Sequence, residues 1–382
     1  MINYFRLTQS LNRPFIQIIA LTVIIYLLVW SLPNPQYAAR GPRSSTPIHN
    51  RVDAVHNETL GFERVFVVNL PSRPDKRDYI TLASSVVGFR PEPIDGVNPD
   101  NIDVKAHPVN WDPNYLPSEF GTWRAHMNVI QRIVRDRVAT AFILEDDADW
   151  DINLKKQFQG FASASQSLQS LQIGNIAAQS PYGNDWDLLW IGHCGIRCRP
   201  GPVHVSTGDA TVVPLPQLPS YWRDPPLGAA NNTRLVCRAE EGVCALGYAV
   251  TYLGAQKILS SLSLTPEGVG AQYDVAISRY CQNGWLKCIA PFPSMIGMWR
   301  PAGPKSRGSD IHSEDGWVEE ATPIGSVYST MYNVRRLLTG KLTVYAVTDD
   351  DAVAREIDPA QLELPEGRLQ VINATGLYDI TF

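Results

Sequence analysis

The stretch that decides the fold is Ala141-Phe142-Ile143-Leu144-Glu145-Asp146-Asp147-Ala148-Asp149-Trp150, in which an apolar run leads directly into a cluster of acids. A short apolar run of this kind predicts a buried strand. The acids then lie at its carboxyl end, where open α/β sheets bind ligands. Carboxylates gathered there suit Mn²⁺ or Mg²⁺, with Asp147 and Asp149 as the ligands. The alternative is a solvated acidic turn.

Strand and helix signals alternate around this stretch between residues 64 and 290, which predicts α/β layers. A strand is expected at 65–70, followed by a turn and a helix through about residue 86. A helix capped by Ser118 is expected next, because Trp123, Met127, Ile130 and Val134 recur at helical spacing. His126 lies on nearly the same side, where a satisfied core histidine is more common than a ligand. Further strands are expected at 186–192 and 245–251.

The composition bounds the class of protein. A chain of 382 residues has enough material for one large domain or two medium ones. The formal net charge is −5, and no cluster of lysines and arginines marks a nucleic-acid footprint.

The N-terminal region predicts membrane attachment. Residues 15–32 are almost entirely apolar, which is long enough for a transmembrane signal anchor. A short tail, 1–14, precedes it, and a proline-rich stem, 33–62, follows. The alternative is a cleaved signal peptide, which leaves the same lumenal domain.

Cysteines and glycosylation sequons favour a lumenal body. The six cysteines all lie between Cys194 and Cys288, and an even count in a secretory context predicts three disulfides. Sequence alone cannot choose their connectivity, and the simplest one joins the close pairs 194/198, 237/244 and 281/288. Three sequons begin at Asn57, Asn231 and Asn373. Residues 195–240 are expected to be an excursion outside the core, and 321–382 a C-terminal extension or an added strand.

Several motifs together resemble glycosyltransferase family 25, the lipopolysaccharide-type and collagen-type galactosyltransferases. The resemblance covers roughly residues 63–312, and the motifs occur in the family's order. Ala125 departs from the pattern, since the family usually has serine before His126. The matching pieces are Val67-Val68-Asn69-Leu70 with Ser72-Arg73 and Arg77, Ile94-Asp95-Gly96, Ser118-Glu119-Phe120-Gly121, Phe142 to Asp147, Asp187 to Gly192, Gly247 to Val250, and Ser309-Asp310-Ile311.

The resemblance implies a GT-A-like, Rossmann-type sheet flanked by helices, here preceded by one transmembrane helix. It implies a catalytic domain at 63–320 that transfers a sugar from a nucleotide-diphosphate donor, with UDP-galactose first, to a glycan or glycoprotein acceptor. Transfer would proceed with inversion and with Mn²⁺ or Mg²⁺. The expected location is the Golgi or endoplasmic reticulum membrane, in a single-pass type II topology.

Candidate site residues follow from the motifs and from the chemistry. Inversion in one displacement needs a carboxylate near the acceptor hydroxyl. Asp274 is the first choice because it opens a helix after a Gly-rich turn, although a helix cap is the alternative. Asp310 and Glu314 are reserves, and His312 could complete a metal shell. The expected nucleotide-sugar ligands are Asn69, Leu70, Arg73, Arg77, Asp95, Glu145 and Asp146.

Two other classes of function remain open at this point. A glycoside hydrolase would use two of the acids as paired carboxylates and would need neither metal nor nucleotide. An inactive, membrane-tethered relative would bind sugar without turning over a donor.

Overall fold

The structure is a computed structural model that describes residues 52–173, 178–219, 231–264, 270–312, 314–347, 356–373 and 376–379. The chain divides into two compact units, Met1–Pro47 and Ile48–Phe382. The first unit lies outside the described residues, and so do the predicted tail, the predicted anchor and most of the stem. Among the described helices, none is both long and apolar enough to cross a bilayer.

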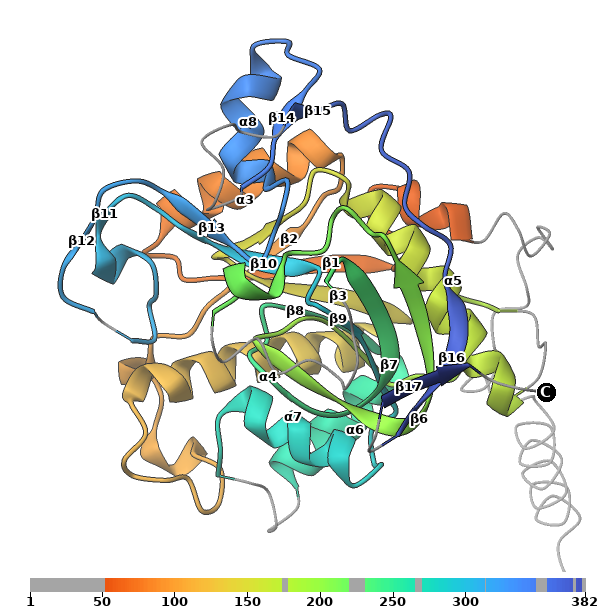
Figure 1. Cartoon of the computed structure of the whole chain (residues 1–382). Helices are drawn as coiled ribbons and strands as arrows, with labels where there is room; N and C mark the ends of the chain where they lie inside the picture. Colours follow the sequence, from red (N-terminus) through yellow and green to blue (C-terminus); the bar gives the residue numbers. More distant parts are fainter. Residues whose placement is uncertain are drawn as a thin grey trace, which may run out of the picture. The chain divides into compact units, whose positions relative to one another are not determined.

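A ten-stranded sheet organises the second unit (Figure 1). Near one edge, β1 lies between β2 and β3 and is parallel to both, whereas β8 is antiparallel to β3. The spatial order of the strands is β17 (Gly376–Asp379), β16 (Arg368–Asn373), β6 (Gly195–Thr207), β7 (Thr233–Val243), β9 (Cys288–Phe292), β5 (Leu188–Gly192), β8 (Gly247–Thr251), β3 (Thr140–Glu145), β1 (Arg64–Asn69) and β2 (Glu92–Asp95).

Helices cover both faces of the sheet, so its central strands are buried on both sides (Figure 1). On one face lie α4 (Pro117–Asp136), α6 (Tyr252–Ser263) and α7 (Tyr273–Gln282), and on the other α3 (Pro74–Val87) and α5 (Leu154–Ile173). α8 (Thr330–Leu338) packs against α3 and β4. The arrangement confirms the predicted α/β class. The predicted strands and helices up to residue 290 are present, although α4 begins at Pro117 rather than after a Ser118 cap.

Short elements complete the described part. A three-stranded sheet contains β13 (Thr322–Ile324), β10 (Ile296–Arg300) and β4 (Ala148–Trp150). Two small pairs are β11 (Gly303–Pro304) with β12 (Trp317–Val318), and β14 (Val344–Tyr345) with β15 (Glu356–Ile357). The 3₁₀ turns are η2 (Asp53–His56), η3 (Pro99–Asn101), η4 (Val104–Ala106), η5 (Leu215–Gln217) and η7 (Lys305–Arg307).

The β1–α3 connection shows how local sequence sets the site. The apolar run of β1 ends at Asn69, and Pro74 occupies the first turn of α3, where its missing N–H leaves no bond unmade. The helix ends at Gly88, whose φ of 81° lies in the left-handed region that glycine adopts without steric cost. Residues 70–77 are thereby held beside the carboxyl ends of the parallel strands.

Residues 195–240 differ from the expected excursion. Their regular parts, β6 and β7, are long paired strands of the main sheet, and apolar side chains such as Val203 and Leu235 are fully buried in its core. The three predicted disulfides form, but with a different connectivity: Cys194–Cys244, Cys198–Cys237 and Cys281–Cys288. Only the last is a close pair. The predicted pairs 194/198 and 237/244 are wrong, because antiparallel pairing of β6 with β7 places residues that are distant in sequence side by side.

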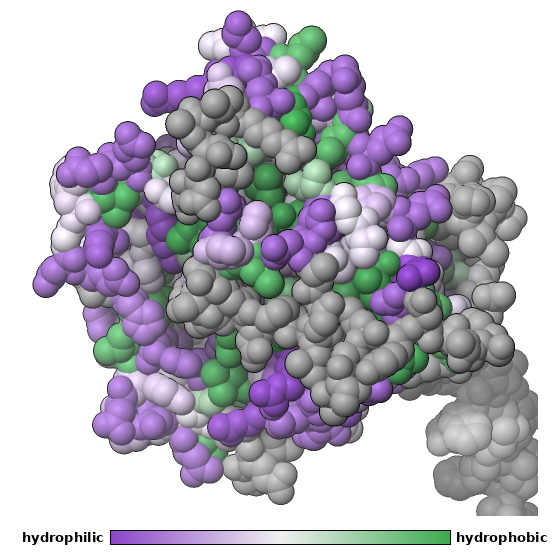
Figure 2. Space-filling model, viewed as in Figure 1, coloured by the Kyte–Doolittle hydropathy of each residue, from purple (hydrophilic) through white to green (hydrophobic). Residues whose placement is uncertain are grey.

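The C-terminal region packs onto the same unit. β16 pairs with β6 and extends the sheet, as the added-strand prediction expected, and Tyr328 of the segment before α8 is fully buried. At the other end, Val55 and Leu60 of the predicted stem are also buried in the core. The segment 305–316 between β11 and β12 stands out from the unit, and hydrophilic side chains dominate that edge in Figure 2.

Candidate active site

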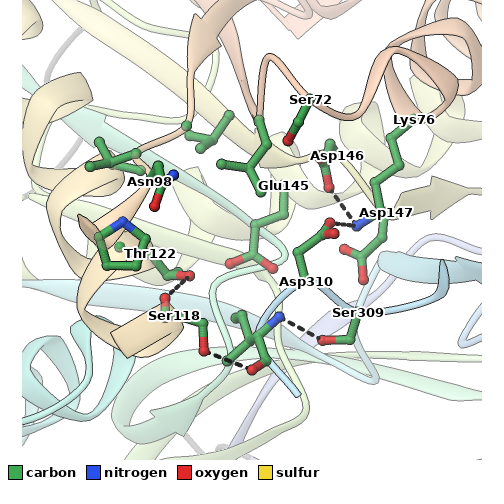
Figure 3. A pocket seen from close by; sticks show the side chains of 18 of the residues that line it. Ser72, Lys76, Asn98, Ser118, Thr122, Glu145, Asp146, Asp147, Ser309 and Asp310 are labelled. Carbon is green, nitrogen blue, oxygen red and sulfur yellow. Dashed lines mark hydrogen bonds and ion pairs between the residues drawn. The ribbon is translucent and has the colours of Figure 1, made fainter. Parts of the chain in front are cut away.

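A cleft of about 330 Å³ lies at the carboxyl ends of the parallel strands β1, β2 and β3. The predicted acids Glu145, Asp146 and Asp147 line it, because β3 ends at Glu145. Asp310 reaches the same cleft from the 305–316 segment. The cleft therefore gathers four carboxylates at the edge where open α/β sheets bind ligands (Figure 3).

Lys76 lies between two of these carboxylates. Its Nζ donates to Asp146 Oδ1 at 3.0 Å and to Asp310 Oδ2 at 2.5 Å (Figure 3). Burial lowers the pKa of Lys76, but the charges of Asp147 and Asp146 outweigh that effect and the pKa is raised. Burial raises the pKa of Asp146 to about 6. The lysine thus joins the end of β3 to the 305–316 segment through a nearly buried ion pair.

Three of the predicted nucleotide-sugar ligands, Asn69, Arg73 and Arg77, lie beside Lys76 and Asp146 but are not among the residues that line the cleft. Asn69 Nδ2 donates to Asp146 Oδ2 at 2.9 Å, and Arg77 Nε donates to Asn69 Oδ1 at 3.0 Å. Arg73 donates to both Asp75 and Asp310, and these carboxylates keep its pKa raised despite burial. Arg73 and Arg77 therefore lie beside the cleft already engaged in hydrogen bonds.

Two further predicted ligands, Leu70 and Asp95, differ in position. Leu70 lines the cleft. Asp95 does not line it: its side chain is 78% exposed and lies 3.7 Å from Arg77 Nη2. The neighbouring Gly96 lines the cleft instead, where a Cβ would lie 3.0 Å from the Leu70 nitrogen.

A second cavity of about 230 Å³ adjoins the first. Glu145 and Asp147 line both cavities. Glu145 Oε1 lies 3.2 Å from His126 Nε2, and Asp147 Oδ2 accepts a hydrogen bond from Arg300 Nη1 at 2.7 Å. His126 is fully buried and satisfied, as the core interpretation expected, yet its ring also lines both cavities.

The prediction that Asp149 binds the cation is wrong in this structure. Its side chain is fully buried, lines neither cavity, and accepts hydrogen bonds from the Ser329 hydroxyl and the Met331 N–H at the start of α8. The physical reason is that β4 pairs with β10 and carries Asp149 away from the main sheet. Burial raises the pKa of Asp149 to about 6.

The remaining catalytic candidates lie around the second cavity. Asp274 lines it, and its Oδ2 accepts from the Cys244 N–H at 2.6 Å. Asp274 also lies in the first turn of α7, but the N-cap residue is Gln272 and no side chain caps the helix, so the cap alternative is wrong. His312 lines the cavity with a side chain that is 61% exposed, whereas Glu314 points to solvent near Lys305.

Sequence reasoning missed Lys76 and Arg300. Both look like ordinary solvated cations in the sequence, and only their place beside carboxylates distinguishes them. It also missed Tyr248 and Tyr273, whose apolar surroundings predict core residues. A weak signal for Lys76 was available, since it follows Pro74 in the first turn after a strand end.

The fit to a divalent cation depends on the donor set. Carboxylate oxygens are the ligands that Mn²⁺ and Mg²⁺ prefer, and such ions are often held by one or two carboxylates together with substrate phosphates. Within the described ranges, no cluster of three His, Cys, Asp or Glu side chains is placed to hold a metal by itself. Asp147 faces both cavities and could hold a cation together with substrate phosphates. The predicted partner Asp149 lines neither cavity and could not.

Comparison with known proteins identifies relatives. No family model matches the chain. It is 24% identical to procollagen galactosyltransferase 1 of Danio rerio over 58% of this chain and 32% of that protein, and 21% identical to procollagen galactosyltransferase 2 of Mus musculus over 69% and 39%. It is 24% identical to the inactive glycosyltransferase 25 family member 3 of Homo sapiens over 74% and 44%. The chain therefore spans less than half the length of these relatives.

Proposed function

We propose that this chain, whose relatives confirm the resemblance to glycosyltransferase family 25, transfers a sugar from a nucleotide-diphosphate donor to a glycan or glycoprotein acceptor. One observation carries the proposal most directly. The acids that end β3 line a cleft together with Lys76, and Glu145 and Asp147 continue into a second cavity. Two adjoining cavities that share carboxylates provide places for a donor and an acceptor.

The fold supports a GT-A-like assignment within this proposal. The parallel strands β2, β1 and β3 form a Rossmann-type half with the cleft at their carboxyl ends. The larger cleft would take the nucleotide sugar. Lys76 at its wall offers a cationic donor that suits a diphosphate, and Asn69, Arg73 and Arg77 lie beside the cleft with further donors.

A divalent cation, Mn²⁺ or Mg²⁺, remains part of the proposal, with Asp147 as the carboxylate that would hold it beside the donor's phosphates. When bound, it would stabilise the negative charge on the departing nucleoside diphosphate. Lys76 also brings positive charge to this cleft, at a distance of 3.0 Å from Asp146 Oδ1.

The relatives leave activity itself to be tested, since their names include both galactosyltransferases and an inactive member. A glycoside hydrolase would cleave a glycan without any nucleotide. Turnover of a nucleotide-sugar donor distinguishes a transferase from both alternatives, because neither a hydrolase nor an inactive relative would consume the donor.

We further propose a lumenal catalytic unit tethered in the Golgi or endoplasmic reticulum membrane by residues 15–32. The three disulfides support an oxidising compartment, because such bonds are rare in the cytosol. Asn57 and Asn231 of two sequons are exposed, as glycan acceptors must be.

The test is turnover of nucleotide sugars by the purified full-length chain. UDP-galactose with a procollagen peptide is the first pair, followed by a panel of other UDP- and GDP-sugars and acceptor glycans, each with and without Mn²⁺. We expect nucleoside diphosphate release coupled to a mass increase of one hexose on an acceptor. Absence of release from every donor, by folded protein, would overturn the proposal in favour of an inactive relative. Glycan cleavage without nucleotide would favour a hydrolase.

A further inference from the structure

We propose that Glu145, and not Asp274 or Asp310, is the general base that takes the proton from the acceptor hydroxyl, and that His126 positions it. This inference rests on the transferase function proposed above. In the step, the acceptor oxygen forms a bond to the sugar's anomeric carbon while its proton passes to the Glu145 carboxylate. The bond from that carbon to the diphosphate oxygen breaks, and the nucleoside diphosphate leaves with the electron pair. Glu145 then returns the proton to solvent.

The junction of the two cavities carries the first part of the argument. A base must lie where the donor's reacting carbon meets the acceptor hydroxyl, and this is the wall that the cavities share. The side chains common to both are those of Thr122, His126, Glu145, Asp147, Ser309 and Ile311. Glu145 and Asp147 are the two carboxylates among them, which reduces the choice to these residues.

The contacts of each carboxylate decide between the candidates. Asp147 Oδ2 is occupied by the guanidinium of Arg300 at 2.7 Å. Asp310 lines only the first cleft, and Arg73 and Lys76 occupy both of its oxygens.

Asp274 and Glu145 also differ in the cavities that they line and in the groups that they contact. Asp274 lines only the second cavity, and its Oδ2 holds the Cys244 N–H at 2.6 Å. Glu145 faces both cavities, and its side-chain partner is the imidazole of His126, whose Nε2 lies 3.2 Å from Glu145 Oε1. Glu145 is therefore the carboxylate best placed to accept a proton at the junction.

A buried aromatic network fixes the imidazole. His126 Nδ1 lies 3.0 Å from the Tyr248 hydroxyl, which donates to the Tyr273 hydroxyl at 2.9 Å. The His126 ring also stacks on Tyr273, with centroids 4.6 Å apart and planes 9° from parallel. Contacts on both nitrogens and on one ring face hold the Nε2 side toward Glu145 Oε1. His126 is thus a positioning residue for the carboxylate.

The test compares full-length variants with the donor on which the wild type turns over. We expect Glu145→Gln to lower kcat for transfer roughly a hundredfold or more, as loss of a general base does, while the Kd for UDP, measured by calorimetry, changes less than about threefold. Glu145→Asp retains the carboxylate but moves it back by one methylene. Its kcat is therefore expected to lie between those of the wild type and Glu145→Gln. Glu319→Gln, on the exposed segment after β12, is the matched control and should retain wild-type kcat.

Tyr248→Phe tests the positioning role without touching the acid. Loss of its hydroxyl should lower kcat roughly tenfold and leave the UDP Kd unchanged, a split that a structural defect would not produce. The inference would be overturned if Glu145→Gln transferred sugar at the wild-type rate. It would also be overturned if Asp274→Asn lost transfer while Glu145→Gln stayed active. Either result would leave the transferase proposal intact. Failure of the wild type on every donor would instead overturn both.

Discussion

Lys76 is the side chain on which the charge balance of the cleft depends. It is 5% exposed and lies between Asp146 and Asp310, whose side chains are 12% and 25% exposed. Removing one partner of a buried ion pair leaves the opposite charges without compensation. The effect on the fold and the effect on a bound diphosphate should therefore appear together at this position.

We expect Lys76→Met to lower the free energy of unfolding by about 3–5 kcal/mol, the range found when one partner of a buried pair is removed. UDP binding should weaken as well, because the diphosphate loses a cation near its site. Urea denaturation and calorimetry with UDP measure the two effects, and Lys105→Met at an exposed position is the control. A variant as stable as the wild type with unchanged UDP affinity would contradict the assigned role.

Asp151 is a buried acid, and its burial makes a pH prediction. Its carboxylate accepts from the N–H groups of Asn153 and Tyr328 and is 1% exposed. Burial raises its pKa to about 7, against about 4 in an unfolded chain. The folded state therefore binds more protons between these values, so the stabilising contribution is present below about pH 4 and is lost as the pH rises through about 7.

For this reason, the free energy of unfolding of wild type minus that of Asp151→Asn should fall between about pH 4 and pH 7. This difference should fall by on the order of 1.4 kcal/mol for each unit by which folding raises the pKa. Urea denaturation of both proteins at several pH values measures it. A difference that stays constant across this window would show that Asp151 titrates as an ordinary acid.

At the scale of single elements, apolar patterning predicted well wherever the local signal was strong. The runs at 65–70 and 141–145 became β1 and β3, and the acids at the end of β3 reached the cleft as expected. Asp149 and Asp151 have the same local character as Asp147, yet β10 and α8, roughly 150 to 180 residues further along the chain, determine where they point. No pattern within the acidic stretch contains that information.

The β6–β7 pair shows the same limit for strands and cysteines. Prolines at 200 and 202 and Gly201 lie within β6, so its sequence is typical of a loop, and its register with β7 shifts between Cys198 and Val203. Pairing across the sheet then determines which cysteines meet. The connectivity could not follow from spacing, because cross-strand neighbours are separated by 39 and 50 residues.

The disulfides give a prediction at this scale. Peptides from the native, non-reduced protein should contain the crosslinks Cys194–Cys244, Cys198–Cys237 and Cys281–Cys288, since pairing of β6 with β7 brings the first four together. Mass spectrometry after proteolysis without reduction identifies them. Crosslinks between 194 and 198 or between 237 and 244 would contradict the strand pairing itself.

At the scale of the whole unit, the site is assembled from parts of the chain that are far apart. The N-terminal β1 and α3 supply Asn69 and Lys76, β3 supplies its acids, and the 305–316 segment supplies Asp310. The family motifs located most of these positions in the sequence, because each is a short local pattern. The cation partners Lys76 and Arg300 could not be assigned before the fold brought them to the acids.

The central claim is that the acids at the end of β3 form a donor site, and the paired variants Asp147→Asn and Asp149→Asn test it most directly. The measurement is donor turnover in Mn²⁺ by the full-length wild type and both variants, with thermal melting recorded in parallel. We expect Asp147→Asn to lose most turnover while it melts like the wild type, because its side chain faces the cavities. Asp149→Asn should melt lower and retain turnover at temperatures where it is folded, because its side chain caps α8. Full turnover in Asp147→Asn would contradict the account.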